Sequence, residues 1–118
     1  MPSSSFPKTE RLLKRKDFVN ANRAGKKFFT EHFLIIVSRN GLGITRLGVA
    51  VSKKTGNSVI RNRVKRLIRE YYRLNKTHFP RGYDVVISAR KGAGELNYWK
   101  AKEELDGFFL EKDFGVLS

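Results

Sequence analysis

The 118-residue chain contains no cysteine, only two histidines, and 11 acidic residues against 25 Lys and Arg. The lack of cysteine excludes thiol catalysis and cysteine-based zinc sites, and it suits a reducing compartment without requiring one. The N-terminal MPSSSFPK has no apolar segment of a secretory signal peptide. No apolar run approaches the ~20 residues of a transmembrane helix. We therefore expect a cytoplasmic protein.

Carboxylates are scarcest where positive charge is concentrated. Residues 1–91 carry 22 Lys and Arg against five acidic residues, whereas residues 92–118 carry three against six. A two-metal nuclease needs several carboxylates around one site, and only a chance meeting of Asp17 and Asp84 would supply them. His32 and His78 have no neighbouring pattern for metal binding or nucleophilic catalysis, so we interpret both as surface or capping residues. We predict no catalytic residue and no metal site in this chain.

The length and composition indicate one domain. With 40% hydrophobic residues and nine Phe, the chain can bury a single core without metal or disulfide support. Residues 1–8, rich in Ser and Pro, are expected to form a flexible N-terminal tail, and residues 9–118 a single domain. The acidic residues near the C-terminus are expected to face away from any anionic ligand; they are Glu103, Glu104, Asp106, Glu111 and Asp113.

Periodicity and turn residues predict a mixed α+β sandwich. The expected elements are, in order, a helix over 14–24 ended by Gly25, strands over 33–37 and 47–51, a helix from 57 to 76, a strand over 83–89, and a helix over 96–110. The first two strands are expected to pair as a hairpin around Gly41 and Gly43. The long helix joins the second strand to the third, so those two strands can run parallel.

The long helix carries most of the functional signal. Residues 53–73 include eight Lys and Arg in 21 positions. At 100° per residue the apolar positions share one face: Ile60, Val64, Leu67, Ile68, Tyr71 and Leu74. The polar positions share the other: Arg61, Asn62, Lys65, Arg66, Arg69 and Arg73. Charges this crowded repel one another unless a polyanion neutralises them.

Nucleic acid is the favoured polyanion. Basic amphipathic helices also bind anionic membranes, but here the apolar face is the one that a globular core requires. The preceding Lys53-Lys54-Thr55-Gly56 resembles half of a phosphate-binding loop without its first glycine. We interpret it as a basic loop at a helix N-terminus, where backbone N–H groups and the helix dipole help lysine to hold a phosphate.

A long stretch of the chain resembles a known family. Residues 50–70, AVSKKTGNSVIRNRVKRLIRE, strongly resemble the RNR motif of the protein subunit of bacterial ribonuclease P, with matching spacing throughout. Lys16-Asp17-Phe18 also resembles the family's first helix, and Arg46 to Val49 its second strand. Gly82 to Val86 and Ala89 to Lys91 resemble its third strand and the exit from it, so the resemblance covers residues 10–110. A ribosomal or other structural RNA-binding protein would have the same composition and fold, and the long RNR match is what distinguishes the two interpretations.

The resemblance implies an αβββαβα fold, similar to a ribosomal protein domain, with a left-handed βαβ crossover. It implies a subunit without catalytic residues, partnered with ribonuclease P RNA. That RNA uses Mg²⁺ to remove the 5′ leader of precursor tRNA by endonucleolytic hydrolysis, giving the mature 5′ end. The protein would bind both the catalytic RNA and the single-stranded leader, the latter in a cleft between the first helix and the sheet.

The resemblance also implies site residues. The contacts to the catalytic RNA would be Lys53, Lys54, Asn57, Arg61, Asn62, Arg63, Lys65, Arg66 and Arg69. The leader cleft would use Phe18, Asn22, Phe33 and Ile36. Phe18 and Phe33 are the candidates for stacking on a base, although Phe33 can equally be plain core. Asn22 and Ile36 stand where the family often has aromatic residues, so leader binding is expected to rest more on charge and apolar packing.

Overall fold

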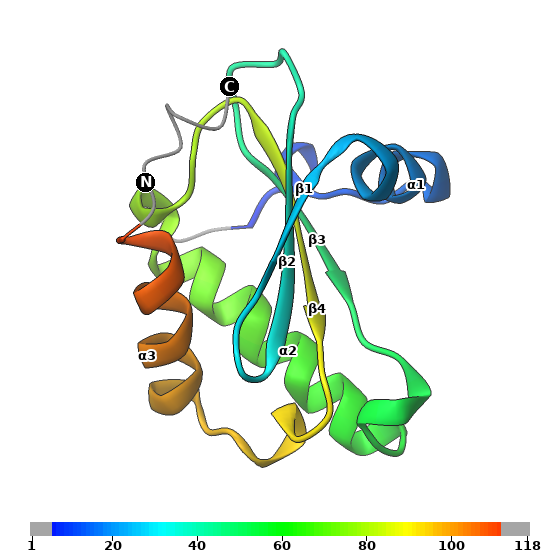
Figure 1. The fold of residues 1–118 in the computed structure, drawn as a ribbon, viewed down its shortest axis with the longest axis vertical. Coiled ribbons are helices and arrows are strands. Elements are labelled where there is room, and N and C mark those ends of the chain that lie inside the picture. The colour runs from blue at the N-terminus through cyan, green and yellow to red at the C-terminus, as the bar shows by residue number, and fades with distance from the viewer. Residues whose placement is uncertain (1–5, 112–118) are drawn as a thin grey trace.

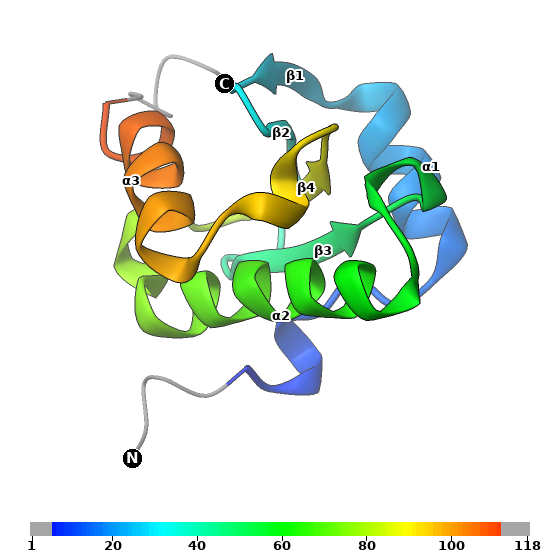
Figure 2. The same ribbon diagram turned by 90° about the horizontal axis from the view of Figure 1, so that it is seen from below.

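The computed structural model describes residues 6–111 and contains one four-stranded sheet with helices on both faces (Figures 1 and 2). The elements are α1 (Arg15–Ala24), β1 (Lys26–Phe29), β2 (Phe33–Arg39), β3 (Arg46–Ala50), α2 (Ser58–Leu74), β4 (Tyr83–Ala89) and α3 (Tyr98–Phe109). Short 3-10 turns lie at Lys8–Glu10, Lys53–Thr55, Lys76–His78 and Ala93–Glu95. This order confirms the αβββαβα fold. No helix within residues 6–111 has both the length and the apolar composition to cross a membrane.

The sheet order is β1-β2-β4-β3, which makes the predicted hairpin wrong. β4 lies between β2 and β3, antiparallel to the first and parallel to the second. Its Tyr83–Ile87 segment is buried throughout, as an inner strand requires. β2 instead pairs with β1, a strand that residue patterns alone did not predict. The parallel pairing of β3 with β4 through α2 is confirmed, and the left hand of this crossover stays an expectation of the resemblance.

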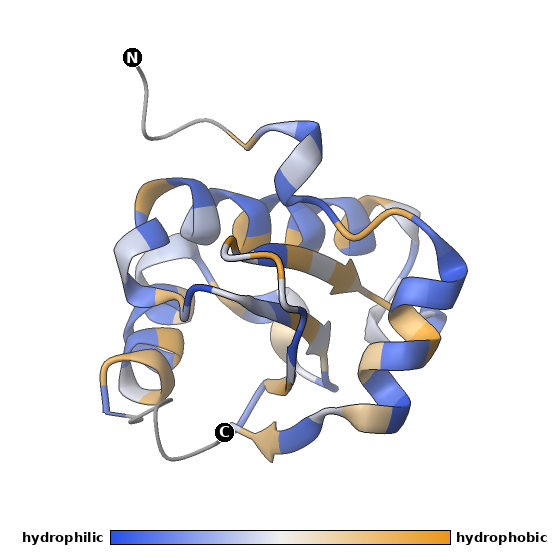
Figure 3. Cartoon of the chain, turned by 90° about the horizontal axis from the view of Figure 1, so that it is seen from above, coloured by the Kyte–Doolittle hydropathy of each residue, from blue (hydrophilic) through white to orange (hydrophobic). Residues whose placement is uncertain are grey.

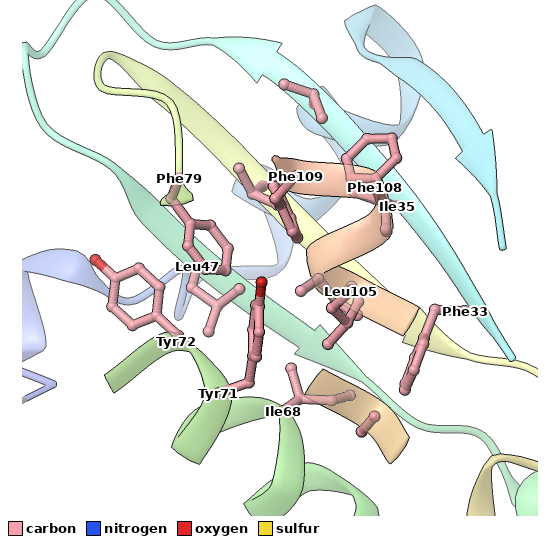
Figure 4. Close-up of a cluster of buried hydrophobic side chains, with 14 of the residues drawn as sticks. Phe33, Ile35, Leu47, Ile68, Tyr71, Tyr72, Phe79, Leu105, Phe108 and Phe109 are labelled. Atoms are coloured by element: carbon pink, nitrogen blue, oxygen red, sulfur yellow. The ribbon is translucent and has the colours of Figure 1, made fainter. Parts of the chain in front are cut away.

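Alternation along β2 divides the apolar residues between two cores. Phe33, Ile35 and Val37 belong to the larger core, which α2 and α3 cover (Figure 4). Ile36 belongs to a smaller core beneath α1, and Leu34 packs against it. Figure 2 shows the corresponding layers, with α1 on one side of the sheet and α2 with α3 on the other. The side of the sheet that faces α1 is therefore separate from the main core.

The long helix α2 is amphipathic as predicted, with two exceptions. Figure 3 shows hydrophobic and hydrophilic residues alternating along its length. Val64, Ile68 and Tyr71 are buried, but Leu74 is half-exposed because the last turn of the helix is not covered. Tyr72, which was not predicted on the apolar face, is buried. Its ring centroid lies 5.0 Å from that of Phe6, and its hydroxyl donates a hydrogen bond to Glu10 at 2.7 Å. Phe6 of the predicted tail is thus packed, and residues 1–5 lie outside the described range.

Candidate nucleic-acid interface

The basic face of α2, defined here by Asn62, Lys65, Arg66 and Arg69, is turned away from the core. Asn62, Arg66 and Arg69 are exposed and Lys65 is half-buried. The helix's single carboxylate, Glu70, pairs with Arg73 at 2.7 Å. Within residues 6–111, no carboxylate lies within ion-pair distance of Lys65, Arg66 or Arg69. Their positive charge is therefore not compensated inside the protein, and an anionic ligand would lower their mutual repulsion.

The loop before α2 adds two more exposed cations, Lys53 and Lys54. Gly56 follows them at φ +153°, in a conformation that favours glycine, and a Cβ there would lie 2.9 Å from Cγ2 of Ile60. The glycine thus lets the basic loop approach the first turn of the helix. Asn57, predicted to contact RNA, caps that turn by accepting a hydrogen bond from the backbone N–H of Ile60 at 3.0 Å.

Arg63 differs from the other predicted RNA contacts because its guanidinium bonds internally. It donates to the carbonyl oxygens of Gly94 and Leu96, in the segment between β4 and α3. The sequence did not predict this role, which joins residues about thirty positions apart. Arg61 is also less exposed to a ligand than Arg66 or Arg69, because it is half-buried. Its Nε is buried and has no hydrogen-bond partner among the described residues.

A cleft of about 340 Å³ opens between α1 and the sheet, and we refer to it as the α1 cleft. Its lining residues are Arg15, Phe18, Val19, Asn22, Leu34, Ile36, Ala50, Val86 and Ser88. Three of the four predicted leader residues, Phe18, Asn22 and Ile36, are therefore brought together. Arg15 and Val19 were missed, although their spacing with Phe18 and Asn22 places all four on one face of a helix.

Phe33 does not belong to the α1 cleft, so its assignment there is wrong. It is only 1% exposed and packs in the larger core on the opposite face of the sheet. The reason is the two-residue period of β2, because Phe33 and Ile36 are three positions apart and point to opposite faces. The alternative interpretation of Phe33 as a core residue is the correct one.

Phe18 is held at the mouth of the cleft by a close approach to β3. A Cβ at Gly48 would lie 2.7 Å from Cε1 of Phe18, so glycine is needed for the ring to rest on the strand. The segment leading into α1 is anchored by a hydrogen bond from the Leu12 N–H to the Leu47 carbonyl at 2.9 Å. Phe18 also lines a second, smaller hollow together with Arg69. The α1 cleft and the basic face of α2 are therefore neighbouring surfaces.

Asp17 and Asp84, the two carboxylates considered for a nuclease site, both face Arg46. The Arg46 guanidinium donates to Asp84 through Nε at 2.8 Å and through Nη2 at 2.7 Å, and its Nη1 lies 3.8 Å from Asp17. Hydrogen bonding to Asp84 raises the pKa of Arg46 above its usual value. Asn40 also donates to Asp84, at 2.9 Å. These carboxylates form a structural ion-pair network around an arginine.

Both histidines are paired with carboxylates of α3. The sequence did not predict these pairs, because their members are far apart along the chain. His78 Nδ1 lies 3.0 Å from Asp106, and His32 Nδ1 lies 2.7 Å from Glu104. Glu104 also accepts from the Thr30 hydroxyl at 2.5 Å and the His32 backbone N–H at 2.6 Å. Burial raises the pKa of Glu104, but these hydrogen bonds together lower it below its ordinary value.

Glu104 and His32, together with Glu31, are also the described residues that come closest to a metal-ligand set. One ligand atom from each lies within 4.8 Å of the others. The oxygens of Glu104 already accept the three hydrogen bonds given by Thr30 and His32. This cluster therefore fastens the β1–β2 turn to α3.

Together these features define a class: a small basic α+β protein with an uncompensated cationic helix face beside an open, aromatic-edged cleft. Such a surface suits single-stranded or folded nucleic acid. The chain matches the family described as Ribonuclease P over residues 6–112.

Individual relatives agree with that match. A ribonuclease P protein component from Desulforapulum autotrophicum is 46% identical over 92% of this chain and 93% of its own length. The one from Thermotoga maritima is 37% identical over 87% of this chain and 92% of its own length. The solved RNase P protein of Thermotoga maritima superposes with a TM-score of 0.80 at 34% identity, covering 88% of this chain and 98% of that one. The Staphylococcus aureus protein gives 0.77 at 31% identity, covering 83% and 90%. The chain belongs to the ribonuclease P protein family.

Proposed function

We propose that this chain binds ribonuclease P RNA through the basic face of α2 and holds the 5′ leader of precursor tRNA in the α1 cleft. The single observation that carries the proposal is the adjacency of these two surfaces in a member of this family. Arg69 and Phe18 line one hollow, so one RNA can lie on the helix while another enters the cleft.

The role of α2 is electrostatic. Bringing a substrate RNA to a catalytic RNA places phosphates close together, and the exposed cations Arg66, Arg69, Lys53 and Lys54 reduce that repulsion. Hydrolysis is assigned to the RNA, with Mg²⁺ as its cofactor, and the protein supplies binding and positioning. The complex should consequently need less Mg²⁺ than the RNA alone.

The role of the α1 cleft is to grip an unpaired strand. Phe18 offers a half-buried ring at its edge, Ile36 an apolar floor, and Asn22 an amide able to hydrogen-bond a base or a 2′-hydroxyl. Arg15 adds a cation for the backbone. Because bases stack on aromatic rings with little sequence preference, this arrangement suits leaders of varied sequence.

We expect Phe18→Ala to reduce the preference for precursor tRNA with a leader over the same tRNA without one. Losing one base-stacking contact should weaken binding of the leader-bearing substrate by roughly 5- to 100-fold. The measurement is the affinity of the protein–RNA complex for both substrates.

Phe29→Ala serves as a matched control, since Phe29 is an exposed aromatic on the edge strand β1 and lines neither surface. Equal weakening of both substrates by Phe18→Ala would contradict the role of the cleft, while leaving the role of α2 intact.

A further inference from the structure

A second large groove lies on the other flank of α2, against the start of α3. It has a volume of about 590 Å³. Its lining residues are Arg63, Arg66, Leu67, Glu70 and Leu74 of α2 with Tyr98 and Trp99 of α3. It shares no residue with the α1 cleft or with the hollow that contains Arg69. We call it the α2–α3 groove, and of its lining residues the functions argued so far use only Arg66.

The groove exposes an unusual amount of aromatic surface. The Trp99 side chain is 72% exposed, although tryptophan is usually largely buried. The Tyr98 ring meets it edge-on, with the ring centroids 5.2 Å apart, which supports the indole at one edge and leaves much of its surface open. Leu74, 49% exposed, adds to the same apolar surface. A planar ligand stacked on Trp99 would remove this surface from water.

The walls of the groove are positively charged. Arg66 is exposed and forms no ion pair with any described residue. Arg63 keeps its charge, since its internal bonds go to neutral carbonyl oxygens. The one carboxylate, Glu70, accepts from Arg73 through both oxygens, at 3.1 and 2.7 Å, so its negative charge is balanced. The groove therefore combines an open aromatic ring with uncompensated positive charge.

That combination matches an unpaired nucleotide. A base can stack on the indole while its phosphate contacts an arginine, as in proteins that bind single strands. A base within a duplex cannot do so, because both its faces are already stacked. A second copy of this chain, with its net charge of +14, would on balance be repelled by a cationic groove.

We propose that the α2–α3 groove holds an unpaired nucleotide of the RNA that lies on α2, with the base stacked on Trp99 and the phosphate at Arg66. This inference rests on the proposed function, because it is the same RNA that would occupy the basic face of α2. It adds a point of recognition for RNA structure, since only a bulged or looped nucleotide can enter.

The test uses Trp99 as its own reporter, because it is the single tryptophan in the chain. Wild-type protein, Trp99→Ala, Trp99→Phe and the control Phe29→Ala are titrated with ribonuclease P RNA, and with a short single strand and a duplex of equal length. We expect Trp99 emission to be quenched by the folded RNA and the single strand but not by the duplex. Trp99→Ala should bind ribonuclease P RNA roughly 5- to 100-fold more weakly.

Further readouts separate stacking from charge. Trp99→Phe should recover most of the lost affinity, and Trp99→Ala should keep the wild-type salt dependence because no cation is removed. If Trp99→Ala binds as well as wild type, or if the duplex quenches Trp99 emission as strongly as the single strand does, the groove proposal is wrong while the role of α2 stands. If folded protein binds no RNA at all, both proposals fall.

Discussion

At the scale of single residues, the cations of α2 divide into two groups that the helical pattern alone could not separate. The 100° spacing predicts which side of the helix each occupies, and the exposed positions of Arg66 and Arg69 confirm it. It could not predict that Arg63, at the flank of the apolar face, bonds two carbonyl oxygens about thirty residues away. Such contacts depend on tertiary packing, which no local pattern encodes.

We expect Arg66→Ala to weaken binding to ribonuclease P RNA and to lower its salt dependence. Each lost phosphate contact should reduce the slope of log K against log salt by about 0.7–0.9. The measurement is a series of binding titrations at increasing salt concentration. Arg39→Ala removes the same charge from β2, where Arg39 stacks on Tyr83, and should leave the slope unchanged. An unchanged slope for Arg66→Ala would refute the phosphate contact.

We expect Arg63→Ala to act mainly on stability. It removes two charge-assisted hydrogen bonds to Gly94 and Leu96, which should lower the free energy of unfolding by about 1–3 kcal/mol. Urea unfolding measures this change, and Arg66→Ala is the matched control because its side chain has no partner among the described residues. If both variants unfold at the wild-type midpoint, the internal role of Arg63 is wrong.

At the scale of elements, the periodic segments were predicted well and the pairing of strands was not. The predicted helix over 14–24 and strand over 83–89 match α1 and β4 within one residue. The hairpin failed because a turn between two apolar runs does not reveal a third strand inserted between them. β1 was missed because its Lys26-Lys27-Phe28-Phe29 sequence has only one half-buried position, as an edge strand allows.

The errors over Phe33 and Glu104 have different causes. The period of β2 is enough to put Phe33 and Ile36 on opposite faces, so that error was avoidable. The bond network of Glu104 with Thr30 and His32 joins residues more than seventy positions apart and was not predictable from sequence spacing.

Glu104→Gln should reveal how strongly α3 is fastened to the sheet. We expect it to lower the free energy of unfolding near neutral pH by about 1–2 kcal/mol, because a carboxylate with three hydrogen-bond donors is replaced by an amide. Urea unfolding across a pH series measures the effect. Glu103→Gln, an exposed neighbour on the same helix, should change little.

The pH dependence of this effect has a definite sign. The folded-state pKa of Glu104 lies below its ordinary value, so its contribution is present above about pH 4–5 and is lost as pH falls through the folded pKa. The difference between wild type and Glu104→Gln should therefore shrink in acid. A difference that stays constant down to pH ~2 would contradict the assigned role of the carboxylate.

At the scale of the whole molecule, positive and negative charges are separated along the chain. The positive part displays exposed cations on α2, and the acidic part supplies carboxylates that form internal bonds. The net charge of +14 is concentrated in residues 1–91, and α2 displays part of it without internal compensation. The acidic residues of α3 were expected only to face away from the ligand. Glu104 and Asp106 instead form internal bonds with His32 and His78, while Glu103 is exposed. Asp113 lies outside the described residues.

The basic face of α2 and the α1 cleft also differ in how far the sequence could define them. The RNR segment predicted the basic face because helix geometry fixes it. The lining of the α1 cleft could be defined only from the three-dimensional structure, because α1, β2, β3 and β4 together supply its walls.

Reconstitution tests the central claim most directly. The purified chain is added to a bacterial ribonuclease P RNA at low Mg²⁺, and cleavage is followed on precursor tRNAs that differ only in the length of the 5′ leader. We predict that the protein restores cleavage and that the gain increases with leader length until the α1 cleft is filled. Restoration without leader dependence would contradict the cleft. No restoration by folded protein with a competent RNA would contradict the account as a whole and favour a structural RNA-binding role.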